Sequence, residues 1–238
     1  MIARPWGGLV LCYHLVDAGV GGRIDLDRAT FERHLDVLAR HDVRSLDDVV
    51  DGSRGIALTF DDAFANFHEV VWPLLRSRGL AVAATLFVPT GFIDGTHASP
   101  LSTAPQLRPC SWPQLREMAA QGLSLGSHTA GHRNLRTLDD AAVDADLLRA
   151  RVRIVEATGH EPRAFCYPQA KWSARTERVA RRHHDVIVTG GGTRVNVARR
   201  WRVPRVSIVR GGMPLELLLR LPVNPREWFA DRVRQWRR

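Results

Sequence analysis

Short apolar runs alternate with longer amphipathic segments along most of the chain. Apolar runs of about four to eight residues, bounded by polar or turn-forming residues, are typical of buried β-strands. We predict seven such strands, at residues 8–13, 56–60, 81–88, 123–126, 164–167, 186–189 and 203–209. Strands that alternate with helices favour a parallel sheet with crossover helices. The α/β pattern therefore predicts a distorted, incomplete (β/α)7-type barrel.

Capping and stop residues place the helices between these strands. Thr30 is predicted to cap the helix that begins at residue 31, and Ser111 to cap a helix with Pro113 in its first turn. A long helix is predicted from residue 138 to residue 158, where Gly159 ends it. Further helices are predicted at 67–79, 175–184, 213–221 and 226–237, and the longest loop at 91–110.

The length and composition fit one folded domain that spans residues 1–238. Hydrophobic residues make up 45% of the chain and charged residues 25%, which is ordinary for a protein with a sizeable core. We find no internal repeat and no stretch that approaches the about 20 apolar residues of a membrane span. The first residues also lack the long apolar segment of a signal peptide, so we expect a cytoplasmic protein.

The positive charge does not by itself indicate nucleic-acid binding. The formal net charge is +9, and every basic residue except Lys171 is an arginine. These arginines are spread along the chain, without the basic helix or interleaved aromatic residues that mark a DNA or RNA site. We interpret them as a solvated surface that can attract an anionic substrate. The three cysteines are far apart, which favours free thiols in a reducing compartment.

Two adjacent acids, Asp61 and Asp62, directly follow the predicted strand 56–60. Two carboxylates this close repel each other, so something must stabilise them. A bound divalent cation would neutralise the local charge and keep at least one of them ionised. Taken alone, such a pair is more often a helix N-cap followed by an acid in the first turn.

Two histidines with H-x-x-x-H spacing follow another predicted strand. His128 and His132 lie in "SHTAGH" at 127–132, and their imidazoles can offer two nitrogens to one metal ion. An isolated pair with this spacing is usually a chance arrangement. However, the carboxyl ends of parallel strands meet at one mouth of a barrel, so both histidines and both acids are expected to lie together.

The motifs "TFDD" (59–62) and "HTAGH" (128–132), with the opening "LCYH" and the later "VPRVSIV", resemble the polysaccharide deacetylase family. This family is also called the NodB-homology domain or carbohydrate esterase family 4, and the resemblance covers about residues 8–210. It implies that Asp61 is the general base and that Asp62, His128 and His132 hold one divalent metal ion. Two histidines and one carboxylate suit a catalytic zinc site with open positions; cobalt, nickel and iron are alternatives.

The general acid must come from elsewhere in the chain, because the Leu-x-His motif of many family members is absent. His14 in "LCYH" is the better candidate. This start resembles the branch that contains the poly-N-acetylglucosamine deacetylases, in which the acid comes from the first strand. The competing interpretation is a core histidine beside Tyr13.

The segment "FCYPQA" (165–170) departs from the Arg-x-Pro-Tyr pattern usual in the family. The resemblance implies that the backbone N–H of Gln169 helps to stabilise the tetrahedral oxyanion. It also implies that Tyr167 and Pro168 contact substrate, and Trp172 could form a wall for a sugar ring. The missing arginine is expected to remove one partner that would tune Asp61.

The sequence thus predicts metal-dependent hydrolysis of an amide C–N bond, with N-deacetylation of an amino sugar in a glycan or soluble glycoside as the preferred reaction. A hydrolase of cyclic imides or ureides is the main alternative, because the "YPQA" segment is altered. A non-haem iron oxygenase also uses two histidines and one carboxylate, but it would not need Asp61. A degenerate member that only binds glycans is the non-enzyme alternative.

Overall fold

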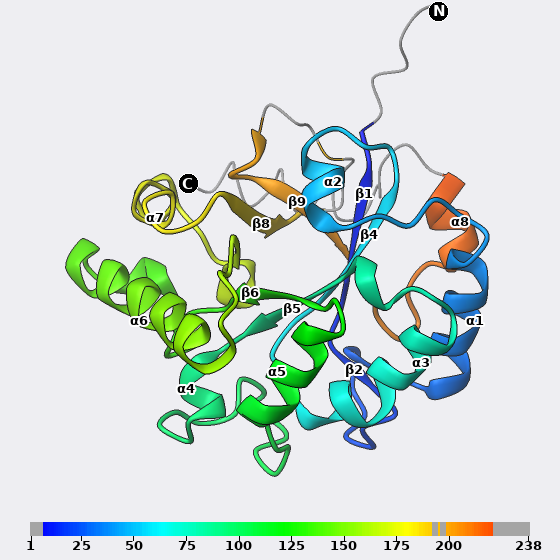
Figure 1. The fold of residues 1–238 in the computed structure, drawn as a ribbon, viewed down its shortest axis with the longest axis horizontal. Helices are drawn as coiled ribbons and strands as arrows, with labels where there is room; N and C mark the ends of the chain where they lie inside the picture. Colours follow the sequence, from blue (N-terminus) through cyan, green and yellow to red (C-terminus); the bar gives the residue numbers. More distant parts are fainter. Residues whose placement is uncertain (1–6, 192–194, 196–198, 221–238) are drawn as a thin grey trace, which may run out of the picture.

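The computed structural model describes residues 7–191, 195 and 199–220, and its core is a closed barrel of parallel strands (Figure 1). The strand order is β1-β4-β5-β6-β7-β8-β9, and the pairing of β9 with β1 closes the ring. The barrel strands are β1 (Leu9–Tyr13), β4 (Ile56–Phe60), β5 (Ala84–Val88), β6 (Ser124–Ser127), β7 (Ala164–Cys166), β8 (Val186–Gly190) and β9 (Val203–Ser207). All seven strands predicted from the apolar runs are therefore present.

Helices cover the outside of the barrel (Figure 1). The α-helices are α1 (Arg28–Leu38), α2 (Leu46–Val50), α3 (Trp72–Ser77), α4 (Thr90–Ile93), α5 (Trp112–Ala120), α6 (Asp140–Thr158), α7 (Ala174–Ala180) and α8 (Leu215–Arg220). The other elements are the π-helix η1 (Phe67–Val71), the 3-10 turns η2 (Ala81–Ala83), η3 (Leu135–Thr137) and η4 (Pro168–Ala170), and the small sheet of β2 (Leu15–Val16) and β3 (Asp25–Leu26). No described helix is both long and apolar enough to cross a membrane.

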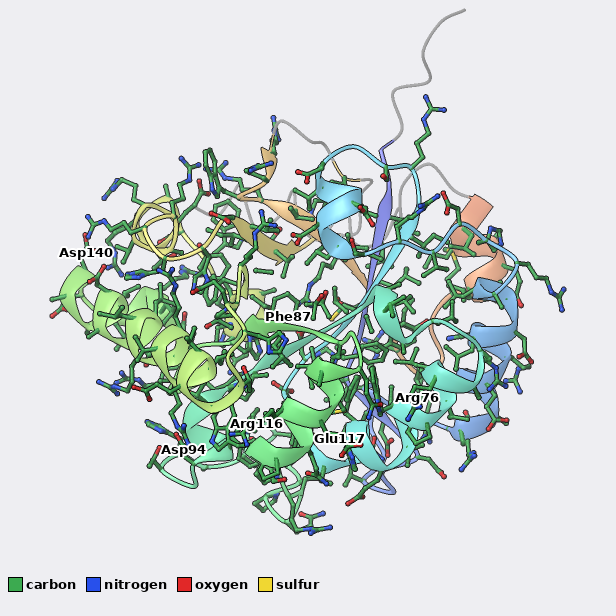
Figure 2. All side chains as sticks on the ribbon, viewed as in Figure 1. Arg76, Phe87, Asp94, Arg116, Glu117 and Asp140 are labelled. Atoms are coloured by element: carbon green, nitrogen blue, oxygen red, sulfur yellow. The ribbon has the colours of Figure 1, made fainter. Side chains whose placement is uncertain are left out.

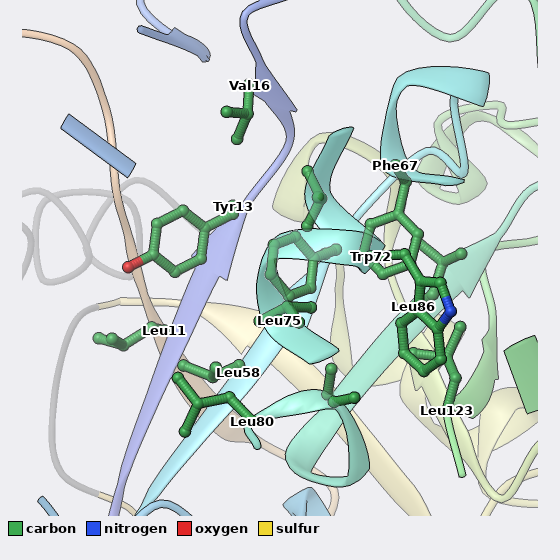
Figure 3. Close-up of a cluster of buried hydrophobic side chains, with 14 of the residues drawn as sticks. Leu11, Tyr13, Val16, Leu58, Phe67, Trp72, Leu75, Leu80, Leu86 and Leu123 are labelled. Carbon is green, nitrogen blue, oxygen red and sulfur yellow. The ribbon is translucent and has the colours of Figure 1, made fainter. Parts of the chain in front are cut away.

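Along most barrel strands, alternate residues pack on opposite sides of the sheet. One set, including Leu11, Leu58 and Leu86, packs against the surrounding helices, as Figure 3 shows around Tyr13 and Trp72. The other set fills the barrel with small and branched side chains, together with Phe87, which lies near the centre of the view in Figure 2. This second set comprises Val10, Ala57, Phe87, Ala164, Cys166, Val186, Val188 and Val203, joined by Val195 and by residues of α2. Strands buried on both faces explain the nearly unbroken apolar runs in the sequence.

Several predicted boundaries are corrected by local hydrogen bonding. Thr30 is not the cap of α1; the Asp27 carboxylate accepts a hydrogen bond from the Thr30 amide at 2.8 Å, so the helix begins three residues earlier. Residues 81–83 form a 3-10 turn, and β5 begins only at Ala84. In contrast, Ser111 caps α5 and Gly159 ends α6 as predicted; Ser111 does so within a capping box, and Gly159 is left-handed.

The predicted loop 91–110 begins inside α4, and α2 was not predicted, because a five-residue helix carries too little periodic signal. The predicted helix 226–237 lies outside the described residues.

Candidate active site

Three potential metal ligands converge where β4 and β6 end. The Asp62 Oδ1 atom lies 3.5 Å from His128 Nε2 and 3.3 Å from His132 Nε2, and the two Nε2 atoms are 3.2 Å apart. A cation bonded at about 2.0–2.1 Å in tetrahedral geometry separates its ligand atoms by about 3.3 Å. The three donor atoms therefore have the spacing and the chemistry that suit a small divalent cation such as zinc.

The orientation of His128 also fits metal binding. Its ring is buried, and the Nδ1 atom lies 2.8 Å from the carbonyl oxygen of Cys166. A carbonyl can only accept, so Nδ1 carries the proton and Nε2 presents a lone pair toward Asp62. Burial opposes ionisation of Asp62, but the two neighbouring imidazoles outweigh it and hold the pKa of this carboxyl well below its usual range. Asp62 is thus available as an anionic ligand.

Asp61, the neighbouring acid, is paired with an arginine that the sequence did not identify. Arg205 of β9 donates from its two terminal nitrogens to Asp61 Oδ1 and Oδ2, each at 2.7 Å. It also donates to the Thr59 hydroxyl at 3.1 Å and lies 2.9 Å from the Cys166 thiol. Burial opposes ionisation of Asp61, yet the guanidinium outweighs it and holds the pKa of the carboxyl well below its usual range.

The 165–170 segment was expected to remove one partner that would tune Asp61, but Asp61 has an arginine partner that β9 supplies instead. The segment 165–170 has Cys166 at the position of the arginine in the usual family pattern, but a guanidinium reaches the Asp61 carboxylate from β9. Arg205 is 5% exposed and its strand neighbours are apolar. The signal in the sequence was a single charge at an inward position of a predicted buried strand, since buried charges are almost always paired.

His14 lies directly after β1 and faces Asp61. Its Nε2 atom is 3.8 Å from Asp61 Oδ2, and 21% of its side chain is exposed. Its Nδ1 atom is buried without a hydrogen-bond partner among the described residues. The side chain is thus beside the site and partly open to solvent, which is the placement that a proton donor needs.

The loop that carries the two histidines is held by side chains on both sides. The Thr129 hydroxyl accepts a hydrogen bond from the His132 amide at 2.8 Å. From α6, the Asp146 carboxylate accepts from the Ala130 amide at 2.8 Å and from the Gly131 amide at 3.3 Å. Asp146 is 1% exposed, and sequence reasoning missed it because the contact depends on how α6 packs against the loop.

The four residues in and near "YPQA" that were predicted to contact substrate or the oxyanion differ in their burial and contacts. Tyr167 is 1% exposed and packs edge-on against Phe165, with ring centroids 4.7 Å apart, so its side chain belongs to the core. Pro168 is also buried, whereas the side chain of Gln169 is exposed and accepts a hydrogen bond from Lys171. Trp172 is half-buried and stacks under the Arg202 guanidinium, 4.8 Å from the ring centroid. Contact of these residues with substrate stays a prediction.

Left-handed backbone conformations gather at the strand ends that form the site. Asp62 and Ala63 follow β4 with φ values of 75° and 48°, and Thr129 and His132 have φ values of 70° and 47°. Gln169, after β7, has a φ of 56°. Such conformations cost free energy in residues other than glycine and concentrate at functional sites. Here they turn successive side chains toward one mouth of the barrel.

Comparisons with known proteins identify the family and support the fold. The sequence model of the polysaccharide deacetylase family matches residues 48–185. YxkH of Bacillus subtilis (strain 168), provisionally named a polysaccharide deacetylase, is 22% identical over 181 residues, covering 72% of this chain and 60% of that protein. The Streptococcus pyogenes deacetylase PplD, solved in complex with acetate, superimposes with a TM-score of 0.78 at 20% identity, covering 93% of this chain and all of that one. IcaB from Ammonifex degensii superimposes with a TM-score of 0.72 at 22% identity, covering 94% of each chain.

The matched segment is more than half of the chain, so the protein belongs to the polysaccharide deacetylase family, a family of hydrolases. At these identities the two structural likenesses show a shared fold. They confirm the predicted barrel, as the family match confirms the predicted family. The chain spans only 60% of the length of YxkH.

Proposed function

We propose that this protein is a metal-dependent deacetylase that removes the acetyl group from an N-acetylated amino sugar of a glycan or glycoside. The observation that carries the proposal is the convergence of Asp62, His128 and His132 at separations of 3.2–3.5 Å, next to an ionised Asp61. Membership of the polysaccharide deacetylase family supports the same reaction.

Asp62 and the two Nε2 atoms would hold the cation. When bound, a divalent cation supplies Lewis acidity to a carbonyl group and lowers the pKa of water. Asp61 would take the proton from the attacking water, and Arg205 fixes the orientation of its carboxylate through two hydrogen bonds. The same arginine weakens Asp61 as a base, so Asp61 depends on a water made more acidic by the site.

Hydrolysis of the amide joins water to the carbonyl carbon, breaks the C–N bond, and gives acetate and a free amine. The departing nitrogen needs a proton, and His14 would donate it, because its imidazole lies beside Asp61 and is partly exposed. The backbone N–H of Gln169 would donate to the oxyanion that forms on the carbonyl oxygen. Both assignments follow from family resemblance and from the position of these residues at the strand ends.

The test measures bound metal and released acetate on the same preparations. Protein purified without chelators is analysed for zinc, cobalt, nickel and iron, and then assayed with N-acetylglucosamine oligomers and with soluble N-acetylated glycosides. We expect Asp62→Asn to lose metal and activity together. Asp61→Asn should keep the metal and lose turnover, and Asp36→Asn, in a surface ion pair with Arg78, should change neither.

Other results would contradict the proposal in different ways. Full acetate release by Asp61→Asn would remove Asp61 as the base. If the protein binds metal and opens the ring of a cyclic imide but releases no acetate from any sugar, the alternative of a cyclic imide or ureide hydrolase is favoured. Salt-sensitive glycan binding with neither metal nor turnover would leave a binding module.

A further inference from the structure

Helix α6 is apolar on two opposite faces. Its inner face packs on the barrel and on neighbouring helices through Val143, Leu147, Ala150, Ile154 and Ala157. Helix α6 lies at the left edge of the molecule in Figure 1. The residues on the opposite side of the helix from this inner row include a second apolar row. A surface helix of a globular protein ordinarily presents polar residues on the side away from the core. The outer row of α6 therefore indicates a contact.

The outer row, which we call the α6 seam, consists of Ala141, Ala145, Leu148, Val152 and Val155. Leu148 is 45% exposed and Val152 is 44% exposed, which places them among the few large hydrophobic residues open to solvent in the described part of the chain. Successive seam residues are four, three, four and three positions apart. That alternation is the heptad spacing by which two helices pack side by side along a coiled-coil seam.

We propose that the α6 seam is a homodimer interface, in which α6 of one protomer packs parallel to α6 of a second copy. The charges beside the seam favour this occupant and this direction. In the heptad spacing of the seam, Ala145 and Val152 occupy a positions. In a parallel pair, the residue just before each a position faces the residue five positions later on the partner. Asp144 then faces Arg149 of the second copy, and Arg151 faces Glu156. Two-fold symmetry gives each opposite-charge pair twice.

An antiparallel pair does not match these charges. With Leu148 against Val152 of the other copy, Arg149 of both copies would meet near the two-fold axis, as would Arg151 of both copies. Like charges so placed destabilise the pair. The charges beside the seam thus favour the parallel direction over this antiparallel register.

The contacts that Asp144 and Arg151 already make within the chain leave both side chains partly exposed, so both can reach a second copy. Asp144 is 37% exposed and binds His183 and Arg182 through Oδ1, and Arg151 is 36% exposed while its Nε atom binds Glu161. The seam itself is short, and two of its five residues are alanines. It buries less than the about 800 Å² per partner of a standard interface, so we expect a weak, concentration-dependent dimer.

The experiment measures the mass of the full chain by sedimentation at concentrations from about 5 µM to about 500 µM, a range that covers weak interfaces. We expect the wild type to shift from monomer to dimer across this range. Leu148→Glu should remain monomeric. Val82→Glu is the matched control, because Val82 is equally apolar, 64% exposed and outside the seam, and it should dimerise like the wild type.

Cross-linking tests the direction. Ala145→Cys should form a disulfide-linked dimer under mild oxidation, because residues at an a position face their own copies in a parallel pair. Val82→Cys should not, and the three native cysteines are buried. A cross-link that needs Ala145→Cys on one chain and Val155→Cys on the other would overturn the parallel arrangement.

Two further outcomes would overturn the interface. One is a wild type that stays monomeric at every concentration. If Leu148→Glu also lowers the melting temperature of that monomer, the seam is covered by another part of the same chain. The other is a dimer that survives Leu148→Glu unchanged.

Discussion

Replacing Arg205 by methionine should destabilise the fold strongly, because it leaves a buried carboxylate without its partner. Arg205 and Asp61 are both 6% exposed as side chains and share two hydrogen bonds of 2.7 Å. Removing one partner of such a pair typically costs about 3–5 kcal/mol. For a chain of this length each kcal/mol lowers the melting temperature by about 2–4 °C, so we expect a fall of about 6–20 °C.

The assay is thermal and urea unfolding of the metal-free protein, with a chelator in every sample so that metal loading does not differ between variants. The double variant Arg205→Met/Asp61→Leu removes the stranded charge and should recover most of the lost stability. It should remain without activity, because the proposed base is gone.

The pH dependence gives a second measurement. In Arg205→Met, burial raises the pKa of Asp61, so the folded state holds a proton more tightly than the unfolded state. The loss of stability should therefore shrink as the pH falls and grow as it rises. A loss below about 1 kcal/mol in Arg205→Met, or no recovery in the double variant, would refute the reasoning about this pair.

Three more predictions concern groups away from that pair. Burial lowers the pKa of His184 from 6.5 to about 4, so the unfolded state takes up the proton first and stability should fall by about 3 kcal/mol between pH 6.5 and pH 4. His184→Asn should flatten that dependence in unfolding curves, and an unchanged slope would show that another group causes it. Asp146→Asn should weaken metal binding about 10–100-fold in chelator competition and speed amide exchange in the histidine loop; tight binding with unchanged exchange would count against its supporting role. Ser111→Ala should cost about 1 kcal/mol in unfolding without changing activity, because it removes the capping box of α5.

The sequence was informative wherever the signal was local. Parallel strands buried on both faces produce continuous apolar runs, which is why all seven barrel strands could be predicted. The grouping of Asp61, Asp62, His128 and His132 followed from topology alone, since parallel strands end at one mouth. Placing these four residues together thus needed no knowledge of the strand register.

Contacts that depend on register and packing could not be predicted in this way. Arg205 reaches Asp61 across 144 positions, and only the stagger of β9 against β1 sets which inward residue meets the carboxylate. Asp146 contacts the histidine loop because of the position of α6 on the barrel. Even the start of α1 depended on a local competition between Asp27 and Thr30 for the capping role.

The closed ring has a consequence for the order of folding. Arg205 lies in the last barrel strand, so the counter-charge of Asp61 is brought in only when β9 pairs with β1, whereas His14 is placed beside Asp61 by the pairing of β1 with β4. Contacts so distant in sequence form late and slowly, since much of the chain must be ordered before they are made. A chain that ended before β9 would expose the edges of β1 and β8 and leave Asp61 without its counter-charge. Ring closure therefore links completion of the fold to assembly of the reactive group, and a partly folded chain would lack the complete site.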